Sequence, residues 1–565
     1  MHIKEFSRRF YIISLLFLIS FVFVICRLIY TQFFHSHYLS AIADKQHSLY
    51  IELIPQRGII YDSSLRPLAI NIAADSLYAV PREIKDKGKV ISLIQPILNA
   101  DYGYLKDRLS RNKSFVWLAR KITPQAAEKI KTLKIKGLGL IRENKRVYPN
   151  GYLAAHSIGF TGIDNQGLEG LEALYEKYLK GRAGWAFFLR DARQNRLNIS
   201  QEMSPPEDGL DIVLTVDEVI QYIAERELDK CFNANNAKGA SIVVLEPFTG
   251  KILALANRPA FDLNYASSAT PDARRDRAIC DLFEPGSVFK IVTASAAIEE
   301  NKVKEDDKFF CENGSYRVAN HTLHDHEPHD WLTFKEVIEQ SSNIGTTKVA
   351  QILGPQVIYR YAKLFGFGEE TAVDLPGEVK GMLKDSKFWS KTSIGAVPIG
   401  QEVGVNVLQL ACATGAIANG GYLMKPFIVS RVQDKQQHVI RQANSVVIRR
   451  VISTDTAERI KIILKGAVEA GTGKLARIGK ISAAGKTGTA QKLEPDGTYS
   501  HRRFVASFVG FAPAEDPLVV IAVVVDEPHP YYFGGVVAAP VFKNVAEEVV
   551  KYLKSKQLGE NRMAL

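Results

Sequence analysis

The sequence predicts an α/β (α+β) fold behind a single N-terminal membrane helix, and four observations lead to this prediction. β-Favouring runs flank a turn within residues 239–259. Three more such runs follow one another at 481–491, 502–513 and 518–528. Helical patterns fill the stretch between, so we expect the sheet to draw strands from both ends of the domain. An apolar run at 10–30 is long enough to cross a bilayer.

Length and composition are those of a multidomain globular chain. The 565 residues are 46% hydrophobic and 24% charged, which allows roughly two to four domains and a large core. A net charge of +11 suits an anionic neighbourhood, but the charge alone does not choose among nucleic acid, a membrane surface and a cell-wall polymer. No RNA-binding, zinc-finger or helix-turn-helix pattern stands out, so nucleic acid is not expected as a partner.

Basic residues before the apolar run predict the topology of the anchor. Lys4, Arg8 and Arg9 favour a cytoplasmic N-terminus, with the rest of the chain exported. A hydrocarbon core of ~30 Å takes about 20 residues to cross, so Arg27 must extend its charge to the interface. A cleaved signal peptide is the competing interpretation. Its small-residue site at 41–43 lies far beyond the apolar run, so we expect an uncleaved, single-pass anchor.

A linker divides the exported part. Residues 204–217 hold two prolines and an Asp-Gly before an alternating apolar run, which is typical of a linker that enters a new strand. Before it, short strands alternate with charged helical stretches such as 124–133, and a last helix is predicted from Pro540. The predicted parts are a cytoplasmic tail at 1–9, a transmembrane anchor at 10–30, a first domain at 31–205, an α/β domain at 206–556 and a C-terminal tail at 557–565.

The cysteines give no strong pattern. Cys26 lies in the membrane run, the other four are widely scattered, and no C-x-x-C pair exists. Most are predicted to be small buried hydrophobes, and one disulfide stays possible. The scattered four are Cys231, Cys280, Cys311 and Cys412.

Ser287 and Lys290 stand three residues apart in FEPGSVFKIVTA, directly after a Pro-Gly break. A helix that begins at Ser287 would place Lys290 on the same face. The following residues are apolar all round, so we expect a buried helix and a lysine whose pKa is lowered towards a neutral amine. Taken alone, the same pattern more often means a capping serine and a solvent-facing lysine.

Two further motifs decide between these interpretations. QSSN offers Ser341 and Asn343, a pair that by itself is usually a turn or a helix cap. A K-T-G-T run follows on a predicted strand, with Lys486, Thr487, Gly488 and Thr489. In the order S-x-x-K, S-x-N, K-T-G, the three motifs define the penicillin-recognising serine acyltransferases, and Ser287 is therefore predicted to be a nucleophile.

Longer stretches carry a resemblance to class B penicillin-binding proteins. They are FEPGSVFKIVTA, QSSNIGTTKVA, IGQEVGVNVLQLACATGAIANGGYLMKP, GKTGTAQ and RGIIYDSSLRPLA, in which Leu65 stands where the family usually has glycine. Residues 146–181 most resemble the division-specific, FtsI-like branch. The resemblance implies a penicillin-binding/serine β-lactamase-like transpeptidase domain with a central antiparallel sheet and a helical subdomain. It also implies an elongated, non-catalytic α+β pedestal that meets partner proteins.

The resemblance also implies a mechanism without a cofactor. Neutral Lys290 would deprotonate Ser287, which would attack the penultimate D-alanine of a peptidoglycan stem peptide, and β-lactams would mimic that D-Ala-D-Ala terminus. The backbone N–H groups of Ser287 and Thr489 would form the oxyanion hole. Lys486, Thr487 and Thr489 would bind the terminal carboxylate, and Gly488 would allow the substrate backbone to approach closely. Ser341 would relay the proton, and Asn343 would hold the amide of the donor peptide. A SEDS-family glycosyltransferase and other divisome membrane proteins would be partners at the division site.

Several alternatives stay open. An elongation-type class B enzyme shares the chemistry, and a membrane-anchored β-lactam sensor or hydrolase shares the motifs. The segment 311–331 is rich in possible zinc ligands but matches no strong template, so no metal site is predicted there. The acceptor diamine and the envelope type are not encoded in any motif. The possible ligands are Cys311, His321, His324, Asp325, His326, His329 and Asp330.

Overall fold

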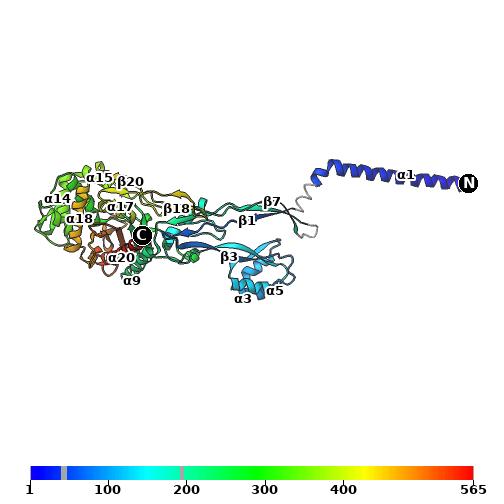
Figure 1. Cartoon of the computed structure of the whole chain (residues 1–565), viewed down its shortest axis with the longest axis horizontal. Helices are drawn as coiled ribbons and strands as arrows, with labels where there is room; N and C mark the ends of the chain where they lie inside the picture. Colours follow the sequence, from blue (N-terminus) through cyan, green and yellow to red (C-terminus); the bar gives the residue numbers. More distant parts are fainter. Residues whose placement is uncertain (1, 40–47, 191–195, 564–565) are drawn as a thin grey trace. The chain divides into compact units, whose positions relative to one another are not determined.

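The computed structural model describes residues 2–39, 48–190 and 196–563, and it begins with a long apolar helix. Helix α1 (His2–Ile29) continues into the π-helical turn η1 (Tyr30–Phe34). Within Ser7–Phe34 the chain is long and apolar enough to cross a membrane, and this apolar stretch is not buried against the rest of the protein. This is the helix that the sequence predicted at 10–30 (blue in Figure 1).

The chain forms two compact units, each discontinuous in sequence. Residues 1–56 join 181–209 in one, and 57–180 join 210–565 in the other. The first unit holds α1 and a three-stranded antiparallel sheet in the order β1-β6-β7. The domain boundary at 205/206 stays a prediction. The strands of this sheet are β1 (Ser48–Leu53), β6 (Gly184–Arg190) and β7 (Arg196–Ser204).

The part of the second unit before residue 180 is an α+β arrangement. Helix α5 packs on the long strand β3, and α3 lies beside α5 (Figure 1). The buried side chains of Leu77, Ile94 and Leu105 belong to one core. Helix α5 follows Thr123, whose hydroxyl accepts the N–H of Ala126, and its bounds are those predicted. The elements are β2 (Ile60–Tyr61), β3 (Pro67–Ala79), β4 (Val116–Ile122), β5 (Leu138–Val147), α3 (Lys87–Leu98), α4 (Tyr102–Ser110) and α5 (Pro124–Leu133).

A buried ionic network ties the start of this unit to its later segments. Glu172 is fully buried in α7 (Gly170–Leu174) and accepts Arg57 Nε at 2.6 Å and Arg146 Nε at 2.7 Å. Arg57 also pairs with Glu176 at 2.6 Å. Because a buried charge is costly unless it is paired, removing one member would leave the others uncompensated. The network therefore fixes the segment that begins at Arg57.

The turn at Leu65 forms although the residue is not glycine. Its φ of +62° lies in the left-handed region, which glycine adopts with least strain. The Asp62 carboxylate holds the turn by accepting the N–H groups of Ser64 at 2.8 Å and Arg66 at 2.7 Å. The departure from the family's usual glycine thus leaves the turn intact.

A five-stranded antiparallel sheet in the order β10-β9-β23-β22-β21 forms the centre of the α/β part. It joins the predicted hairpin of 239–259 to the three strands predicted near the C-terminus. The K-T-G strand β21 lies at one edge, where Thr487 pairs with Phe508. The strands are β9 (Gly239–Leu245), β10 (Ile252–Arg258), β21 (Ala484–Leu493), β22 (Tyr499–Ala512) and β23 (Val519–Asp526).

Alternate residues of these strands face two separate cores. Val523 of β23 packs against the face covered by α9 (Glu218–Ala234) and α20 (Ala539–Met563), whereas Val524 belongs to the core on the other face. The wholly buried helix α17 (Val407–Ala418) lies in that second core. Helix α20 is the predicted last helix, and its Val545 and Val549 are fully buried.

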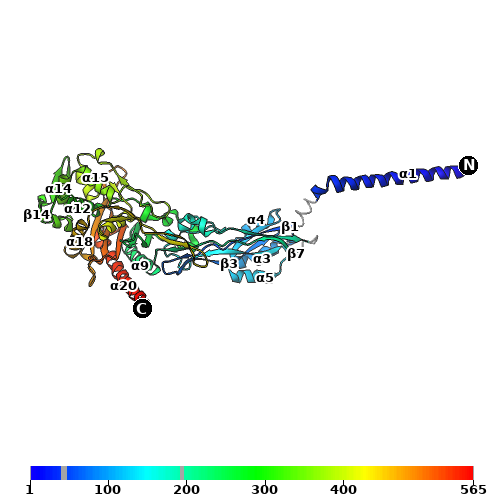
Figure 2. The ribbon, with the colours of Figure 1, turned by 45° about the horizontal axis from the view of Figure 1, so that its top comes forward.

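A group of helices forms a subdomain whose core continues that of α17. Helix α12 contacts α14, α15 and α18, which Figure 2 shows gathered around it. Because α12 is almost wholly buried, a lysine at its start has no route to solvent along an exposed face. The helices are α12 (Lys290–Glu299), α13 (Phe334–Glu339), α14 (Asn343–Leu353), α15 (Pro355–Leu364) and α18 (Thr454–Glu469).

Short elements connect these parts. The strands are β8 (Asp211–Leu214), β11 (Lys308–Phe310), β12 (Ser315–Val318), β13 (His321–His324), β14 (Trp331–Thr333), β15 (Met382–Leu383), β16 (Val403–Gly404), β17 (Tyr422–Met424), β18 (Val429–Gln433), β19 (Val439–Gln442) and β20 (Val447–Arg450). The helices are α6 (Ala155–Ile158), α8 (Glu176–Leu179), α10 (Pro271–Arg274), α11 (Arg277–Cys280), α16 (Ser393–Ala396) and α19 (Gly534–Val537).

Candidate active site

Ser287 lies in a one-turn 3-10 helix rather than at the start of an α-helix as the sequence predicted. This turn, η3 (Gly286–Phe289), leads directly into α12. Gly286 adopts a left-handed φ of +55° after Pro285, and so the chain enters the turn sharply. Residues three apart eclipse each other in a 3-10 helix, and the tighter turn thus keeps Lys290 on the side of Ser287.

Glycines let the Ser287 turn approach its neighbours closely. The N–H of Gly286 donates to Gly400 O at 3.2 Å, and a Cβ on Gly400 would lie 2.1 Å from Gly286 O. On the other side, a Cβ on Gly488 would lie 2.8 Å from both Pro285 O and a methyl group of Val288. The fold therefore brings the S-x-x-K turn against the K-T-G strand.

Lys290 is fully buried and reaches the S-x-N motif. Its Nζ donates to Ser341 O at 2.6 Å and to Asn343 Oδ1 at 2.8 Å, and it lies 3.2 Å from Ser341 Oγ. Burial lowers the pKa of Lys290 to about 7, although the negative charge of Asp325 opposes this shift. A large share of the amine is therefore neutral near pH 7.

A neutral Lys290 has a lone pair free to act as a base. The amine then carries two N–H donors, and the two shortest contacts, to Ser341 O and Asn343 Oδ1, use both. The lone pair is left for a hydroxyl group. Ser287 is half-buried, and its Oγ makes no hydrogen bond within the described residues, so it is free to offer its proton.

Ser341 is held in an unusual backbone conformation. Its φ is +62°, a left-handed value that costs a non-glycine residue roughly 1–3 kcal/mol. This conformation directs its carbonyl oxygen to Lys290, 2.6 Å away. Next to it, the Asn343 side chain donates to His324 O at 2.9 Å, which fixes the orientation of its amide. The predicted pair thus meets Lys290 from the start of α14.

Lys486 is a second buried amine in the same site. Only 1% of the residue is exposed, and within the part of the chain that the structure describes its Nζ has only long contacts, 3.4 Å to Thr487 O and 3.5 Å to Thr487 Oγ1. Burial first, and then the charge of Lys290, lower its pKa well below the usual lysine value. An amine so poorly partnered is prepared for an anion such as a carboxylate.

The two threonines of the K-T-G-T run are anchored by residues that the sequence did not single out. Thr487 Oγ1 lies 2.7 Å from Thr472 Oγ1, and Thr489 Oγ1 accepts the N–H of Gly534 at 3.0 Å. A Cβ on Gly534 would lie 2.1 Å from Gly488 O, so only glycine allows this approach. Thr472 and Gly534 lie far from the motif in sequence, and no local signal marks them.

The histidine-rich segment contributes a carboxylate to the site. Within residues 2–39, 48–190 and 196–563, no group of three or more His, Cys, Asp or Glu side chains could hold a metal ion. Asp325 instead accepts Ser342 Oγ at 2.6 Å and the N–H of Ile344 at 3.0 Å. The ring centroid of His326 lies 4.7 Å from that of Phe533. Asp325 was noted in the sequence only as a possible metal ligand.

The cysteines behave largely as the sequence predicted. Cys231, Cys311 and Cys412 are buried, and all five cysteines are free. Cys280 is half-buried and its thiol donates to Gly377 O at 3.2 Å. Burial raises the pKa of the Cys280 thiol to about 11, so it is not a reactive thiolate at neutral pH.

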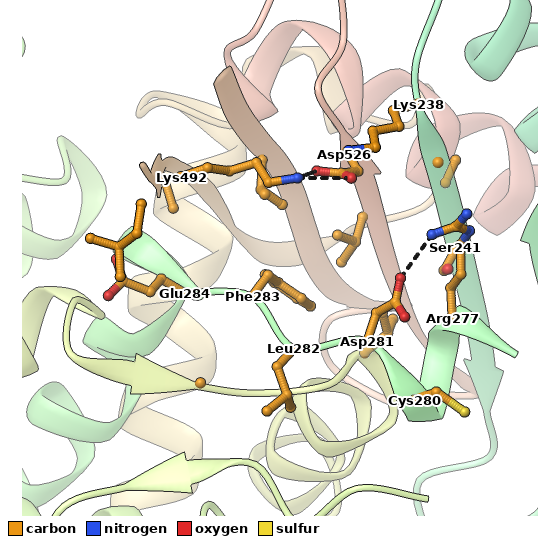
Figure 3. A pocket seen from close by; sticks show the side chains of 18 of the residues that line it. Lys238, Ser241, Arg277, Cys280, Asp281, Leu282, Phe283, Glu284, Lys492 and Asp526 are labelled. Carbon is orange, nitrogen blue, oxygen red and sulfur yellow. Dashed lines mark hydrogen bonds and ion pairs between the residues drawn. The ribbon is translucent and has the colours of Figure 1, made fainter. Parts of the chain in front are cut away.

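A cavity of about 610 Å³ lies beside the Ser287 turn. The segment 280–284 and strands β9, β21, β22 and β23 line it, and ion pairs join Lys492 to Asp526 at 2.7 Å and Arg277 to Asp281 at 2.9 Å (Figure 3). None of the predicted site residues lines this cavity. The predicted residues gather around Lys290 instead, and we take that cluster, not the cavity, as the candidate site.

Comparisons with known proteins agree with the motifs. The family model described as Penicillin-binding Protein dimerisation domain matches residues 52–214, and that described as Penicillin binding protein transpeptidase domain matches residues 240–547. "Stage V sporulation protein D" of Bacillus subtilis is 35% identical, over 95% of this chain and 84% of that protein. "Peptidoglycan D,D-transpeptidase FtsI" of Escherichia coli is 30% identical, over 97% of this chain and 92% of that protein.

A solved structure shares the fold over most of the chain. Penicillin binding protein 3 of Mycobacterium tuberculosis, complexed with aztreonam, superposes with a TM-score of 0.71 at 28% identity. The match covers 89% of this chain and 97% of that structure. Two matched domains, near-full-length relatives and a common fold lead to one conclusion: the chain belongs to the penicillin-binding proteins, with the dimerisation and transpeptidase domains of class B.

Proposed function

We propose that the chain is a serine-type peptidoglycan D,D-transpeptidase that cross-links stem peptides through an acyl-enzyme at Ser287. The observation that carries this proposal is the buried amine of Lys290, with its pKa of about 7 and its contacts to Ser341 and Asn343. A base needs a pKa near the working pH, and a serine needs such a base to become a nucleophile. Relatives named as peptidoglycan D,D-transpeptidases support the reaction class.

Acylation begins with proton transfer from Ser287 Oγ to neutral Lys290. The oxygen attacks the carbonyl carbon of the penultimate D-alanine, and the carbonyl oxygen becomes an oxyanion. The backbone N–H groups of Ser287 and Thr489 receive it, and each donor is worth roughly 3–4 kcal/mol in the transition state. Lys486, Thr487 and Thr489 hold the terminal carboxylate. Gly488 has no side chain to obstruct the substrate backbone.

The second half of acylation releases the terminal D-alanine. The proton held by Lys290 returns through Ser341, whose Oγ is 3.2 Å away, to the leaving amine. Asn343 holds the donor peptide's amide while its own amide is fixed by Lys290 and His324 O. The side-chain amine of an acceptor peptide then attacks the ester carbonyl; the new C–N bond closes the cross-link, the C–Oγ bond breaks, and a proton from the amine returns to Ser287 Oγ.

β-Lactams are expected to acylate Ser287 in place of the stem peptide, and this gives the test. The full-length protein is labelled with a fluorescent penicillin, and release of the label is timed. We expect a bond that persists for many minutes and is lost in Ser287→Ala, while the surface variant Ser92→Ala keeps it. Release within seconds would favour the alternative, a β-lactam hydrolase. Absence of labelling in the parent would overturn the proposal.

The cellular role that we propose is septal wall synthesis at the division site. Its support is the resemblance of residues 146–181 to the division-specific branch and the 30% identity to Escherichia coli FtsI. A SEDS-family glycosyltransferase and other divisome membrane proteins are the partners we propose by resemblance. The name of the Bacillus subtilis relative connects that protein with sporulation. An elongation-type role, which shares the chemistry, is the second candidate for this chain.

Complementation tests the cellular role. The intact protein should rescue a conditional septation mutant and should localise to midcell, whereas Ser287→Ala should localise but not rescue. Sidewall localisation with rescue of an elongation mutant would favour the second candidate.

We also propose that one N-terminal helix anchors the enzyme in the plasma membrane, with a cytoplasmic N-terminus and an extracytoplasmic catalytic domain.

A further inference from the structure

Asp325 lies where the loop after β13 meets the first turn of α14. Its N–H donates to Gly314 O at 3.2 Å, which holds the residue beside the hairpin β12–β13. One carboxylate oxygen accepts Ser342 Oγ at 2.6 Å, and the other accepts the N–H groups of Asn343 and Ile344. A residue 17 positions away in sequence thus reaches the S-x-N motif.

The carboxylate completes the capping of α14. A helix leaves its first four N–H groups without intrahelical partners. Asp325 accepts those of Asn343 and Ile344, and Ser342 Oγ accepts that of Gly345 at 2.9 Å. The fourth, that of the N-cap residue Ser342, donates to Val337 O at 2.9 Å. Ser342 can fill its cap position and still donate its own proton to Asp325. A negative charge is also favourable at a helix N-terminus.

The same loop holds the side chain that contacts Lys290. His324 O, one residue before the carboxylate, accepts Asn343 Nδ2 at 2.9 Å, and Asn343 Oδ1 faces Lys290 at 2.8 Å. Ser341, just before the capped turn, keeps the left-handed φ of +62° that brings its carbonyl to Lys290. Both acceptors of the Lys290 amine therefore depend on how the start of α14 is fixed.

We propose that Asp325 is a positioning residue for acylation at Ser287, acting through the first turn of α14 on the two acceptors that orient the Lys290 amine. The inference rests on the function proposed above. Asp325 does not touch the reacting atoms. Its role is to hold Ser341 and Asn343 where they consume the two N–H groups of the neutral amine, so that the lone pair is directed at the serine hydroxyl.

Asp325 also acts on Lys290 through its charge. The charged groups that face the amine are Asp325, from the loop after β13, and Lys486, from β21, while α14 presents the uncharged Asn343. The negative charge of Asp325 raises the pKa of Lys290 against the larger effect of burial. Acylation requires the neutral amine, so its rate should rise with pH around the pKa of about 7. Loss of the negative charge should move that rise to lower pH.

Two variants separate the charge from the capping contacts. Asp325→Asn removes the charge, whereas Ser342→Ala removes the donor of the 2.6 Å hydrogen bond and leaves the carboxylate in place. Asp330→Asn is the matched control, because it removes an exposed carboxylate from the same loop. Each is made in the full-length protein, and the second-order rate constant of acylation by a fluorescent penicillin is measured from pH 5 to pH 9, with thermal unfolding measured in parallel.

We expect Asp325→Asn to acylate about tenfold or more slowly at pH 8, since a small misplacement of catalytic groups has effects of this size. The midpoint of its pH profile should lie below that of the parent. Ser342→Ala should be slow with the parent's midpoint, Asp325→Glu should recover that midpoint, and Asp330→Asn should match the parent in both respects.

Two results would overturn the inference. One is a rate and midpoint for Asp325→Asn equal to those of Asp330→Asn. The other is an Asp325→Asn protein that is slow but keeps the parent's midpoint, with Asp325→Glu equally slow, which would mean a structural role alone. If Asp325→Asn does not fold, the same comparison between Asp325→Glu, Ser342→Ala and the control decides. A parent that is never acylated would instead refute the proposed function.

Discussion

Lys290 and Lys486 place two amines in one buried site, and neither forms an ion pair with a described residue. Burial lowers the pKa of both, and the positive charge of Lys290 lowers that of Lys486 further. The amine beside Asp325 and Ser287 is then suited to be a base, and the amine on the sheet edge is suited to bind an anion. A substrate carboxylate at Lys486 would raise the pKa of that lysine and restore its positive charge. A charged Lys486 would in turn keep Lys290 neutral, so substrate binding would support the role of Lys290 as a base.

Gly488 allows the two halves of the site to meet, and Gly488→Ala is expected to separate them. The new Cβ would lie 2.3 Å from Ser507 Oγ and 2.8 Å from Pro285 O, the carbonyl at the start of the Ser287 turn. Backbone cannot give way cheaply at such distances, so we expect a loss of about 1–3 kcal/mol in the free energy of unfolding. Displacement of Ser287 from β21 should slow penicillin acylation by about a hundredfold.

Gly479→Ala is the matched control for this change. Its Cβ would have no neighbour within 4 Å, and its φ is not in the left-handed region. Acylation and denaturant unfolding of both variants are compared with the parent. Equal acylation by Gly488→Ala and Gly479→Ala would contradict the close contact between the turn and the strand.

At the scale of elements, helix α20 supports the sheet that carries Lys486. Phe542 is fully buried, and its ring centroid lies 4.7 Å from that of Phe508, which pairs with Thr487 across the strands. Phe542→Ala should therefore lower the free energy of unfolding by about 3–5 kcal/mol. Leu558→Ala, on the same helix but 65% exposed, should change it by no more than about 0.5 kcal/mol. Urea unfolding measures both, and similar losses would mean that α20 is not packed as described.

The elements that the sequence predicted well are those with a strong local period. Strands of the central sheet alternate or run apolar, and α20 carries its valines at helical spacing, so their ranges came close to those observed. The 3-10 turn at Ser287 was missed because a helix pattern does not distinguish a tight first turn from an α-helical one. The left-handed Ser341 and the cap from Asp325 depend on contacts between distant segments, which no local pattern encodes.

At the scale of the whole molecule, the proposed chemistry and the membrane helix are separable parts. All of the predicted site residues belong to the compact unit of residues 57–180 and 210–565, whereas α1 belongs to the other unit. The apolar window of Ser7–Phe34 has no buried surface within the protein, and only a bilayer or another apolar partner would remove it from water. Attachment and acylation should therefore respond to different changes.

Replacement of residues 1–34 by a cleavable export signal is expected to release the protein from the membrane without slowing acylation. The helix supplies the apolar length needed to span the bilayer, and it supplies no residue to the Lys290 site. The intact chain should sediment with membranes, while the shortened chain should stay in the soluble extracytoplasmic fraction with a penicillin acylation rate within about twofold of the parent.

A phosphatase that is active only outside the cytoplasm should be active when fused after Leu565 of the intact chain. Exchange of Lys4, Arg8 and Arg9 for glutamate should reduce that activity, because these residues favour the cytoplasmic side. Two results would contradict the single-pass topology: a shortened chain that still sediments with membranes, or a phosphatase that is inactive when fused to the intact chain.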